Sequence, residues 1–589
     1  MVVTHKKWWK SSIVYQIYPA SFKDSNGDGI GDIPGIISKL DYIADLGVNI
    51  IWVCPMYDSP QVDMGYDISN YEDVYPPYGT LADMELLTRE SHARGMRVML
   101  DLVINHTSDR HPWFVDSRSS RANPKRDWYI WRKARYGPDG QRYPPNNWRA
   151  NFGGGSAWEW DPVTEEYYLH LFAKEQPDLN WENPVTRRAI YASSMEFWLE
   201  RGVDAFRVDT VNMYSKPPGL PDAPISNQEA DVQAAFTLYC NGPRIHEYIG
   251  EMNAILRKHN AITVGELPHT PEMERVLKYV SAEAGQLDMV FQFDVADVGL
   301  GKIHKFDTVP RAWTLSDLKM AVARTQDLIR GTDAWTTVFL ENHDQARSIS
   351  RFASDLPEHR VASGKMLALL ETTLSGTLFL YQGQEIGAVN APGKSYPITE
   401  YRDIESLLYY KMVDERTGGC AETLDRAFSA LQHLARDHAR IPIAWDGAAP
   451  NAGFSAADGA RPWMATHPLA SEINVADQIN NERSVLCFWR KMLRFRREHV
   501  DLLVYGDFRL LRVEDPDLFM FAKDNHQGDM VVVVLNFTKS TKGWDQPRPE
   551  ELGLGVAGGI QLTMLVSSEG ADGGNLLAPF EARIYRVGT

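Results

Sequence analysis

Short apolar runs recur between residues 13 and 383 of the chain, and helical patterns separate them. Between the first two runs, Ile36, Leu40 and Ile43 fall on one helical face, Pro34 suits the first turn, and Gly47 can end the helix. Strand therefore alternates with helix, as parallel sheets require. We predict eight strands: Ile13 to Pro19, Val48 to Pro55, Arg97 to His106, Gly202 to Thr210, Ile262 to Leu267, Met289 to Asp294, Thr336 to Asp344 and Thr377 to Gly383.

Eight βα units are the number that closes a TIM barrel, so we predict an α/β protein with a (β/α)₈ barrel; the pattern alone leaves an open doubly wound sheet as the alternative. The segment after the third strand, rich in Trp, Tyr, Gly, Asn and Pro, is too long for an ordinary loop. We expect an inserted subdomain whose aromatic residues wall a pocket, because it leaves the carboxyl end of a barrel strand. The predicted domains are the barrel (1–106 and 182–506), the insertion (107–181) and a C-terminal β-sandwich (507–589).

The C-terminal prediction rests on a change to period-two apolar patterns separated by Gly, Pro, Asp and Asn, which is typical of antiparallel strands. The segments are Phe508 to Val513, Leu518 to Lys523, Met530 to Phe537, Gln561 to Val566 and Phe580 to Val587.

Composition narrows the range of partners. The chain of 589 residues has 61 Lys and Arg against 78 Asp and Glu, and this net charge of −17 argues against nucleic acid and anionic membranes and favours a small neutral substrate. We find no apolar run of about 18 residues and no apolar signal segment at the polar N-terminus, so we expect a cytoplasmic protein. The widely spaced Cys54, Cys240, Cys420 and Cys487 are expected to be unpaired.

Acidic residues gather at the ends of the predicted strands. Apolar and charged positions alternate at the end of the fourth strand, so Arg207 and Asp209, two positions apart, project to the same side. Glu266 lies at the end of the fifth strand and Asp344 at the end of the seventh. Cleavage of a glycosidic bond needs one carboxylate to attack the anomeric carbon and one carboxylic acid to protonate the leaving oxygen, roughly 5 Å apart if configuration is retained. We interpret Asp209 as the nucleophile and Glu266, which has no basic neighbour in its strand, as an acid of raised pKa. A purely structural Arg207–Asp209 ion pair is the alternative.

These strand ends resemble glycoside hydrolase family 13, the α-amylase family, in its oligo-1,6-glucosidase and maltase branch. The resemblance covers essentially the whole chain. It implies Asp209 as nucleophile, Glu266 as acid/base and Asp344 as the acid that grips the sugar hydroxyls, with His106, Arg207 and His343 binding the same glucose. The matching segments are Asp101–His106, Gln176–Trp181, Gly202–Asp209, Gly265–Glu266 and Phe339–Asp344.

The same resemblance implies a sealed pocket and therefore exo cleavage. Tyr66 and Asp67 match the branch, and Asp67 is expected to pair with Arg440 behind the terminal glucose. The segment Arg436–Pro442 resembles the branch motif, but His438 replaces its usual Asn and Ile441 its usual Thr, which weakens the choice of Arg440 over Arg436. Two further pocket contacts are carried over from the family: Phe172 and Gln176.

The linkage preference is expected to depend on Thr210, directly after the nucleophile. Members of the branch that prefer α-1,6 bonds resemble one another in having Val there, whereas maltase-like members have Ala or Thr. A pocket difference of this size is worth roughly 1 to 3 kcal/mol, so we expect a bias rather than an absolute choice.

One loop spaces oxygen ligands at alternate positions, as calcium loops do, although Gly35 stands where an EF-hand has its bidentate Glu. The resemblance implies a structural Ca²⁺ or Mg²⁺ here, with a metal-free turn as the alternative; no organic cofactor is expected. The predicted ligands are Asp24, Asn26, Asp28, Ile30 and Asp32.

Together these features predict an exo-acting, retaining α-glucosidase acting on maltose and short malto-oligosaccharides, with sucrose or aryl glucosides as further substrates and with possible transfer to acceptor sugars. Alternatives within the enzymes are an isomaltase, a trehalose or trehalose-phosphate hydrolase and a sucrose isomerase; outside them, an inactive partner of a membrane transporter. We expect a monomer or a homodimer.

Overall fold

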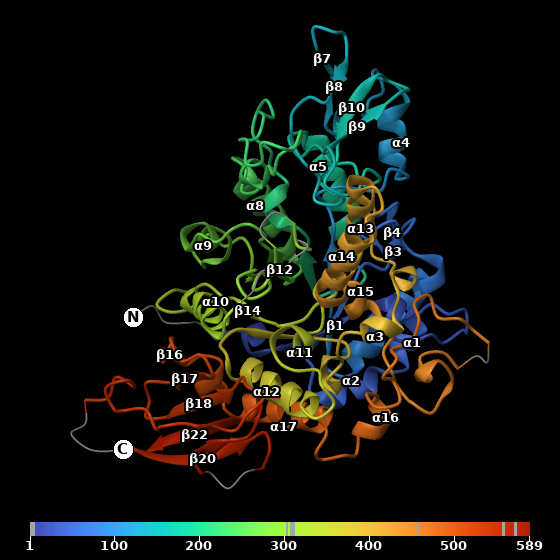
Figure 1. Ribbon diagram of the computed structural model, residues 1–589. Helices are drawn as coiled ribbons and strands as arrows, with labels where there is room; N and C mark the ends of the chain where they lie inside the picture. The colour runs from blue at the N-terminus through green and yellow to red at the C-terminus, as the bar shows by residue number, and fades with distance from the viewer. Residues whose placement is uncertain are drawn as a thin grey trace.

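The computed structural model describes residues 6–301, 304–306, 313–456, 459–555, 560–570 and 574–588 (Figure 1). Its centre is an eight-stranded sheet in which every pair of neighbours is parallel, in the order β13-β12-β11-β5-β2-β1-β15-β14. A further parallel bridge between Val290 and Thr336 joins the two ends, so the sheet closes into a barrel. The strands are β1 (Ile13–Ile17), β2 (Ile50–Val53), β5 (Arg97–Leu102), β11 (Ala205–Val208), β12 (Ile262–Glu266), β13 (Met289–Phe291), β14 (Thr337–Val338) and β15 (Thr377–Tyr381).

The predicted (β/α)₈ barrel is thus confirmed, and every predicted strand contains an observed one. The strands are shorter than predicted because their carboxyl-terminal residues belong to the loops that carry the site. Helices alternate with them: α2 (Leu40–Leu46), α3 (Leu81–Ala93), α8 (Ile245–Lys258), α10 (Leu315–Asp327), α12 (Arg360–Thr373) and α17 (Val485–Glu498). The helical segment after the insertion consists of α5 (Pro184–Ile190), the π-helical turn η5 (Tyr191–Glu196) and α6 (Phe197–Leu199).

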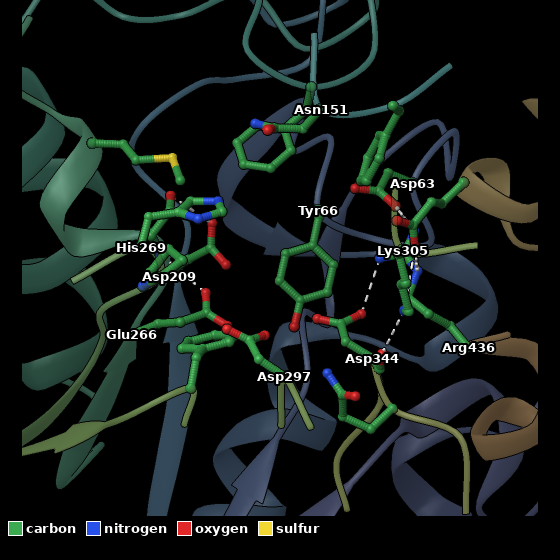
Figure 2. A pocket seen from close by; sticks show the side chains of 18 of the residues that line it. Asp63, Tyr66, Asn151, Asp209, Glu266, His269, Asp297, Lys305, Asp344 and Arg436 are labelled. Carbon is green, nitrogen blue, oxygen red and sulfur yellow. Dashed lines mark hydrogen bonds and ion pairs between the residues drawn. The ribbon is translucent and has the colours of Figure 1, made fainter. Parts of the chain in front are cut away.

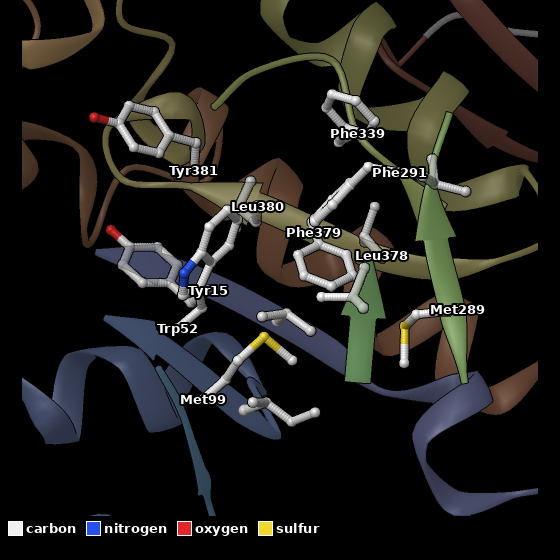
Figure 3. Packing of buried hydrophobic residues seen from close by; sticks show 14 of the residues in the cluster. Tyr15, Trp52, Met99, Met289, Phe291, Phe339, Leu378, Phe379, Leu380 and Tyr381 are labelled. Atoms are coloured by element: carbon white, nitrogen blue, oxygen red, sulfur yellow. The ribbon is translucent and has the colours of Figure 1, made fainter. Parts of the chain in front are cut away.

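Aromatic rings fill the middle of the barrel (Figure 3). The ring of Phe291 lies 4.7 Å from that of Phe379 and 5.8 Å from that of Trp52, between centroids, and all three side chains are buried. Trp52 also donates from Nε1 to Asp101 Oδ2 at 2.7 Å. This indole therefore separates the apolar interior from the polar layer above it.

The insertion after β5 forms a subdomain beyond the carboxyl ends of the barrel strands (Figure 1). Its own apolar core includes Trp148 and Trp158 and is completed by Met213 and Tyr239 from the loop after β11. The insertion is therefore anchored to the loop that follows Asp209. Its elements are α4 (Pro112–Ser119), the antiparallel sheet β6-β10-β9 (Trp131–Arg132, Glu166–Leu169, Trp158–Asp161) and the hairpin β7-β8 (Arg135–Tyr136, Arg142–Tyr143).

The C-terminal domain is one antiparallel five-stranded sheet of order β16-β17-β18-β22-β20, as the period-two pattern predicted. Phe519 and Phe521 on one face belong to the same core as the barrel, whereas Met520 on the other face packs with Trp544 in a separate cluster. Barrel helices therefore supply one covering layer, and the predicted sandwich is reduced to this sheet with a small ribbon, β19-β21 (Lys542–Gly543, Leu576–Leu577). The strands are β16 (Asp507–Leu511), β17 (Leu518–Asp524), β18 (Met530–Asn536), β20 (Gln561–Ser567) and β22 (Ala582–Gly588).

Two helices near the barrel mouth have no counterpart in the predicted strand-and-helix alternation: α13 (Ile404–Thr417) and α14 (Ala421–Leu434), followed by the short α15 (Asp437–Arg440). Within the described residues, no helix combines the length and apolar character needed to cross a membrane. All four cysteines are unpaired, as predicted.

Candidate active site

A cavity of about 280 Å³ opens at the carboxyl end of the barrel strands (Figure 2). Asp209 and Thr210 directly follow β11, and Glu266 is the last residue of β12. Asp209 and Glu266 lie on one side of the cavity in Figure 2, with Asp344 and Arg436 on the other and Tyr66 between them. The predicted site residues that line it are Tyr66, His106, Phe172, Asp209, Thr210, Glu266 and Asp344.

Arg207 connects the acids beneath the cavity. Its Nη1 lies 2.7 Å from Asp101 Oδ1 and 2.7 Å from Asp209 Oδ1, and its Nη2 lies 2.9 Å from Glu266 Oε1. The guanidinium is almost fully buried, so these charge-assisted contacts are little screened by water. The basic neighbour that Glu266 lacks in its own strand is thus supplied by the adjacent strand β11.

Glu266 is nevertheless suited to hold a proton. Burial raises the pKa of its carboxyl to about 7, against the lowering effect of Arg207 and with a further increase from Asp209 and Asp344. Burial prevails because the carboxylate is removed from water while Arg207 is shared among three acids. Near neutral pH this group is therefore present in both its protonated and its ionised form, which suits a residue that acts first as a general acid and then as a general base.

Thr210 has a left-handed backbone, with φ 37° and ψ 43°. A β-branched residue is strained there, at a cost of about 1–3 kcal/mol. The conformation points its N–H at Glu266 Oε2, at 3.2 Å, and its hydroxyl Oγ1 lies 3.2 Å from Asp209 Oδ2. The residue predicted to influence linkage therefore contacts both predicted catalytic carboxylates.

Asp344 lies at the opposite side, among basic groups. Its Oδ1 is 2.9 Å from Arg436 Nη1 and 3.0 Å from Arg440 Nη2, and its Oδ2 is 3.2 Å from His343 Nε2. Burial alone raises the pKa of Asp344, but these cationic neighbours outweigh it and hold the pKa well below its usual range. Burial lowers the pKa of His343 to about 3, so this ring is neutral at pH 7 and the arginines carry the effect.

Tyr66 packs flat against His343, with ring centroids 5.2 Å apart and planes 3° apart. Its hydroxyl lies 2.6 Å from His343 Nε2. The tyrosine is therefore a rigid wall of the cavity, and the histidine behind it is fully buried rather than exposed to the cavity.

The pair expected to seal the pocket differs from the prediction. Asp67 is fully buried and holds its own turn, accepting from Ser59 Oγ and from the N–H groups of Val62 and Asp63. Asp63 lines the cavity instead, with Oδ1 3.4 Å from Arg436 Nη2.

Arg440 lies deeper than expected, where its Nε donates to the His343 carbonyl at 3.0 Å. Arg436, by contrast, lines the cavity and pairs with Asp63, so these two residues occupy the place expected for Arg440 and Asp67. Asp67 does not reach the cavity because residues 62–67 form a tight turn that directs its carboxylate inward to backbone N–H groups.

The remaining predicted contacts lie beside this pair. Gln176 is fully buried and donates from Nε2 to Asp63 Oδ2 at 3.1 Å, so it orients the sealing acid. Phe172 packs on His106 with ring centroids 5.1 Å apart, and both rings line the cavity.

Comparison with known proteins identifies the framework that carries these acids. Residues 16–506 match the family model for the α-amylase catalytic domain. The chain belongs to the α-amylase family. It is therefore a glycoside hydrolase, and the resemblance predicted from its strand ends is confirmed.

Relatives in the α-amylase family extend over the full length. The chain is 48% identical to an α-glucosidase of Candida albicans, covering 99% of this chain and 100% of the relative. It is 45% identical to an oligo-1,6-glucosidase of Saccharomyces cerevisiae, covering 99% and 98%. Among solved structures, an isomaltulose synthase variant from Erwinia rhapontici in complex with sucrose matches with a TM-score of 0.89 at 36% identity, covering 99% and 100%. These similarities place the chain in the oligo-1,6-glucosidase and maltase branch.

Several cavity residues were missed by sequence reasoning. Lys305 donates from Nζ to the Asp344 carbonyl at 3.1 Å and lies 3.4 Å from Glu405 Oε2 at the start of α13. His269 and Asp297 also line the cavity. His269 follows Glu266 closely enough to have been suspected, whereas the other three come from loops and from the additional helix α13, which no motif marks.

The predicted metal loop closes on itself through hydrogen bonds. Asp24 accepts from the N–H groups of Asn26, Gly27 and Gly29, and Asp32 caps α1 (Ile33–Ile37) by accepting from the Gly35 N–H. The oxygen donors suit a hard cation by type. Within the described residues, no group of three His, Cys, Asp or Glu side chains is placed to hold a metal ion.

Proposed function

We propose that this chain is an exo-acting, retaining α-glucosidase that releases terminal glucose from maltose and short malto-oligosaccharides. The observation that carries the proposal is the pair of carboxylates, Asp209 and Glu266, held by one guanidinium at the edge of a cavity whose other end is occupied by Asp63, Arg436 and Asp344. The full-length similarity to an α-glucosidase supports it.

In the first step, the protonated Glu266 gives its proton to the glycosidic oxygen while Asp209 attacks the anomeric carbon, and the aglycone leaves. A glycosyl ester on Asp209 results. In the second step, Glu266 removes a proton from water as the water attacks the same carbon, and Asp209 is released. The pKa of about 7 at Glu266 suits both roles, and Arg207 compensates the charge on Asp209 before it attacks and after it is released.

Two inversions at the anomeric carbon give net retention. Proton NMR of the first turnovers tests this step: α-glucose should appear before mutarotation, and β-glucose as the first product would exclude the double displacement. A glycosyl ester that survives long enough to meet a sugar hydroxyl also accounts for the transfer to acceptor sugars that we expect at high substrate concentration.

Exo attack follows from the charged groups at the far end of the cavity. Asp344 is held ionised by two arginines, and Asp63 pairs with Arg436 and accepts from Gln176. Such fixed charges are suited to the hydroxyls of a terminal glucose and leave a longer glucan no passage. Malto-oligosaccharide digests sampled early should contain glucose and the shortened chain; internal fragments would refute exo cleavage.

The linkage preference is tested by the ratio of kcat/KM for maltose over isomaltose, in the wild type and in Thr210→Val. The hydroxyl of Thr210 lies 3.2 Å from Asp209 Oδ2, so its loss should shift the ratio toward isomaltose by roughly 1 to 3 kcal/mol. A wild type that prefers isomaltose would support the second candidate, an oligo-1,6-glucosidase, which the 45% identical yeast relative favours.

Isomerisation of sucrose is the third possibility, favoured by the similarity to isomaltulose synthase. Incubation with sucrose separates it from hydrolysis, because an isomerase yields a disaccharide and a hydrolase yields glucose and fructose. A protein inactive on all these sugars would fit the alternative of a transporter partner.

We also propose a structural Ca²⁺ or Mg²⁺ in the loop of Asp24, Asn26, Asp28 and Asp32, with the carbonyl of Ile30. The donor set supports it, and the reaction itself needs no metal in the steps above. Thermal unfolding with calcium and with chelator is the test. A midpoint that rises with calcium in the wild type but not in Asp28→Ala would support the ion, and equal midpoints would refute it.

The four free cysteines support a cytoplasmic location, which we propose on that basis. Fractionation of the source cells with an activity assay would test it. The choice between monomer and homodimer remains a prediction for sedimentation.

A further inference from the structure

A buried lysine lies beneath the active site and takes no part in the proposed chemistry. Lys216 follows Asp209 in the loop after β11, and its Nζ lies 2.7 Å from Asp178 Oδ2 and 2.9 Å from Asn105 Oδ1. All three side chains are almost completely buried. One ammonium group therefore connects the loop after the nucleophile, the loop after β5 and the end of the insertion.

The lysine decides how the Asn105 amide is oriented. An ammonium group can only donate hydrogen bonds, so the amide must turn its oxygen toward Lys216. The amide nitrogen Nδ2 then faces the other way, 3.2 Å from Asp178 Oδ2 and 3.2 Å from His106 Nδ1. Asp178 reinforces the same orientation, because a carboxylate accepts from the amide nitrogen and repels the amide oxygen.

The amide in turn decides which nitrogen of His106 carries the proton. Burial lowers the pKa of His106, so the ring is neutral near pH 7 and has one N–H only. Nδ1 accepts from Asn105 and Nε2 lies 3.2 Å from the Tyr66 carbonyl, so these two contacts place the proton on Nε2, against the single opposing donor, the amide nitrogen of Gln176 at 3.3 Å from Nε2. His106 lines the cavity, so the position of its proton affects the hydrogen bonds that this wall can offer to a sugar.

We propose that Lys216 is a positioning residue that, through Asn105, selects the Nε2–H tautomer of His106 and so fixes the hydrogen-bonding character of this wall toward the sugar. The inference rests on the proposed glucosidase activity for its kinetic consequence but not for the tautomer itself. A lysine that acted only as a strut between loops would affect stability and leave the tautomer unchanged.

Lys216→Met keeps the length of the side chain and removes the donor. The Asn105 oxygen then loses its donor and only Asp178 still holds the amide nitrogen, so the preference for the Nε2–H tautomer of His106 weakens. Asn105→Asp favours the Nδ1–H tautomer with Lys216 intact, because a carboxylate can only accept from Nδ1–H. Lys319→Met is the matched control: Lys319 is equally buried, but its Nζ donates to backbone carbonyls of residues 512, 513 and 515, at the junction with the C-terminal domain.

The tautomer is measured from the ¹⁵N shifts of the His106 ring in protein labelled at histidine, with His106→Asn to assign the signals. The kinetic readout is kcat/KM for an aryl α-glucoside. We expect Nε2–H in the wild type and in Lys319→Met. In Asn105→Asp we expect Nδ1–H and a kcat/KM lower by about tenfold, the equivalent of one hydrogen bond. In Lys216→Met we expect a larger share of Nδ1–H than in the wild type and a loss of kcat/KM in the same direction.

The proposal is overturned if both site variants keep the Nε2–H tautomer, or if Lys319→Met lowers kcat/KM as much as Lys216→Met. If Lys216→Met does not fold, the proposal is tested with Asn105→Asp alone, by its His106 ring shifts and its kcat/KM. A wild type that is inactive on glucosides would refute the proposed function, whereas the ring shifts would still answer the question of the tautomer.

Discussion

Arg207 allows a quantitative test of how the site is held together, through the substitution Arg207→Met. The guanidinium contacts three buried carboxylates at 2.7, 2.7 and 2.9 Å. Removing one partner of a buried ion pair costs about 3–5 kcal/mol, mainly because the remaining charge is left without compensation. The variant should lose stability of that order, unless its carboxyls take up protons.

The pH dependence of this loss follows from the pKa values. Burial raises the pKa of Glu266 to about 7 and that of Asp101 to about 7, and Arg207 opposes the rise in both. Without Arg207 both values rise further above those of the unfolded chain. The native variant then binds more protons than the unfolded chain between about pH 4 and its raised pKa values, so its stability falls as pH rises through this window. We expect a small loss at pH 5 and the full loss at pH 8.

Thermal unfolding midpoints at pH 5 and pH 8, for wild type and variant, measure the effect. Arg496→Met is the control, since the buried Arg496 donates to the carbonyls of Thr372, Leu374 and Gly376. Its midpoint should fall by a similar amount at both pH values. An Arg207→Met midpoint that also falls equally at pH 5 and pH 8 would show that the three acids do not depend on the guanidinium for their charge.

Four further outcomes are expected. Because Glu266 must be protonated to act and its pKa is about 7, kcat/KM should fall about tenfold per pH unit above that value, and a flat profile to pH 9 would contradict the assignment. Burial raises the pKa of Asp63 to about 7, so this acid is more fully ionised at pH 8 than at pH 6. Asp63→Asn, which mimics the protonated acid, should therefore lower kcat/KM more at pH 8 than at pH 6. An equal loss at both pH values would show that the charge of Asp63 does not contribute to activity. A Cβ at Gly242 would lie 1.8 Å from the Ser215 carbonyl oxygen, so Gly242→Ala should destabilise by about 1–3 kcal/mol in urea unfolding, and an unchanged midpoint would disprove the close approach. Burial lowers the pKa of Lys523 to about 7, so between pH 7 and about 10 the unfolded chain binds more protons than the folded protein. The stability of the wild type should therefore rise with pH across that window, and that of Lys523→Met should not. Urea unfolding midpoints at pH 7 and 9 measure the difference.

Local pattern was sufficient for the barrel strands and for the three acids at their ends. A strand buried on both sides reads as a continuous apolar run, and its carboxyl end is the place where barrels present polar groups, so the sequence alone places Asp209, Glu266 and Asp344 at one face. The prediction that Arg207 and Asp209 project to the same side also holds in the structure, because side chains along a strand alternate with a period of two.

Local pattern could not predict the contacts between segments that are distant in the sequence. The choice of Asp63 over Asp67 depends on a turn whose backbone N–H groups capture the Asp67 carboxylate. The choice of Arg436 over Arg440 depends on how α15 is set against the loop after β14, since both arginines reach Asp344. Neither preference is visible in spacing, because both candidates in each pair are charged residues of the same type only four positions apart.

The sequence by itself determined the barrel, the insertion, the C-terminal sheet and the three carboxylates, since these follow from periodicities and motifs that act over a few residues. Only the tertiary structure decided the environment of those carboxylates. Arg207 reaches Glu266 from the neighbouring strand, and Lys216 reaches Asn105 across more than a hundred positions of the chain. Charges interact through space and burial depends on every segment that packs around them, so the protonation of this site is a property of the folded molecule rather than of any motif.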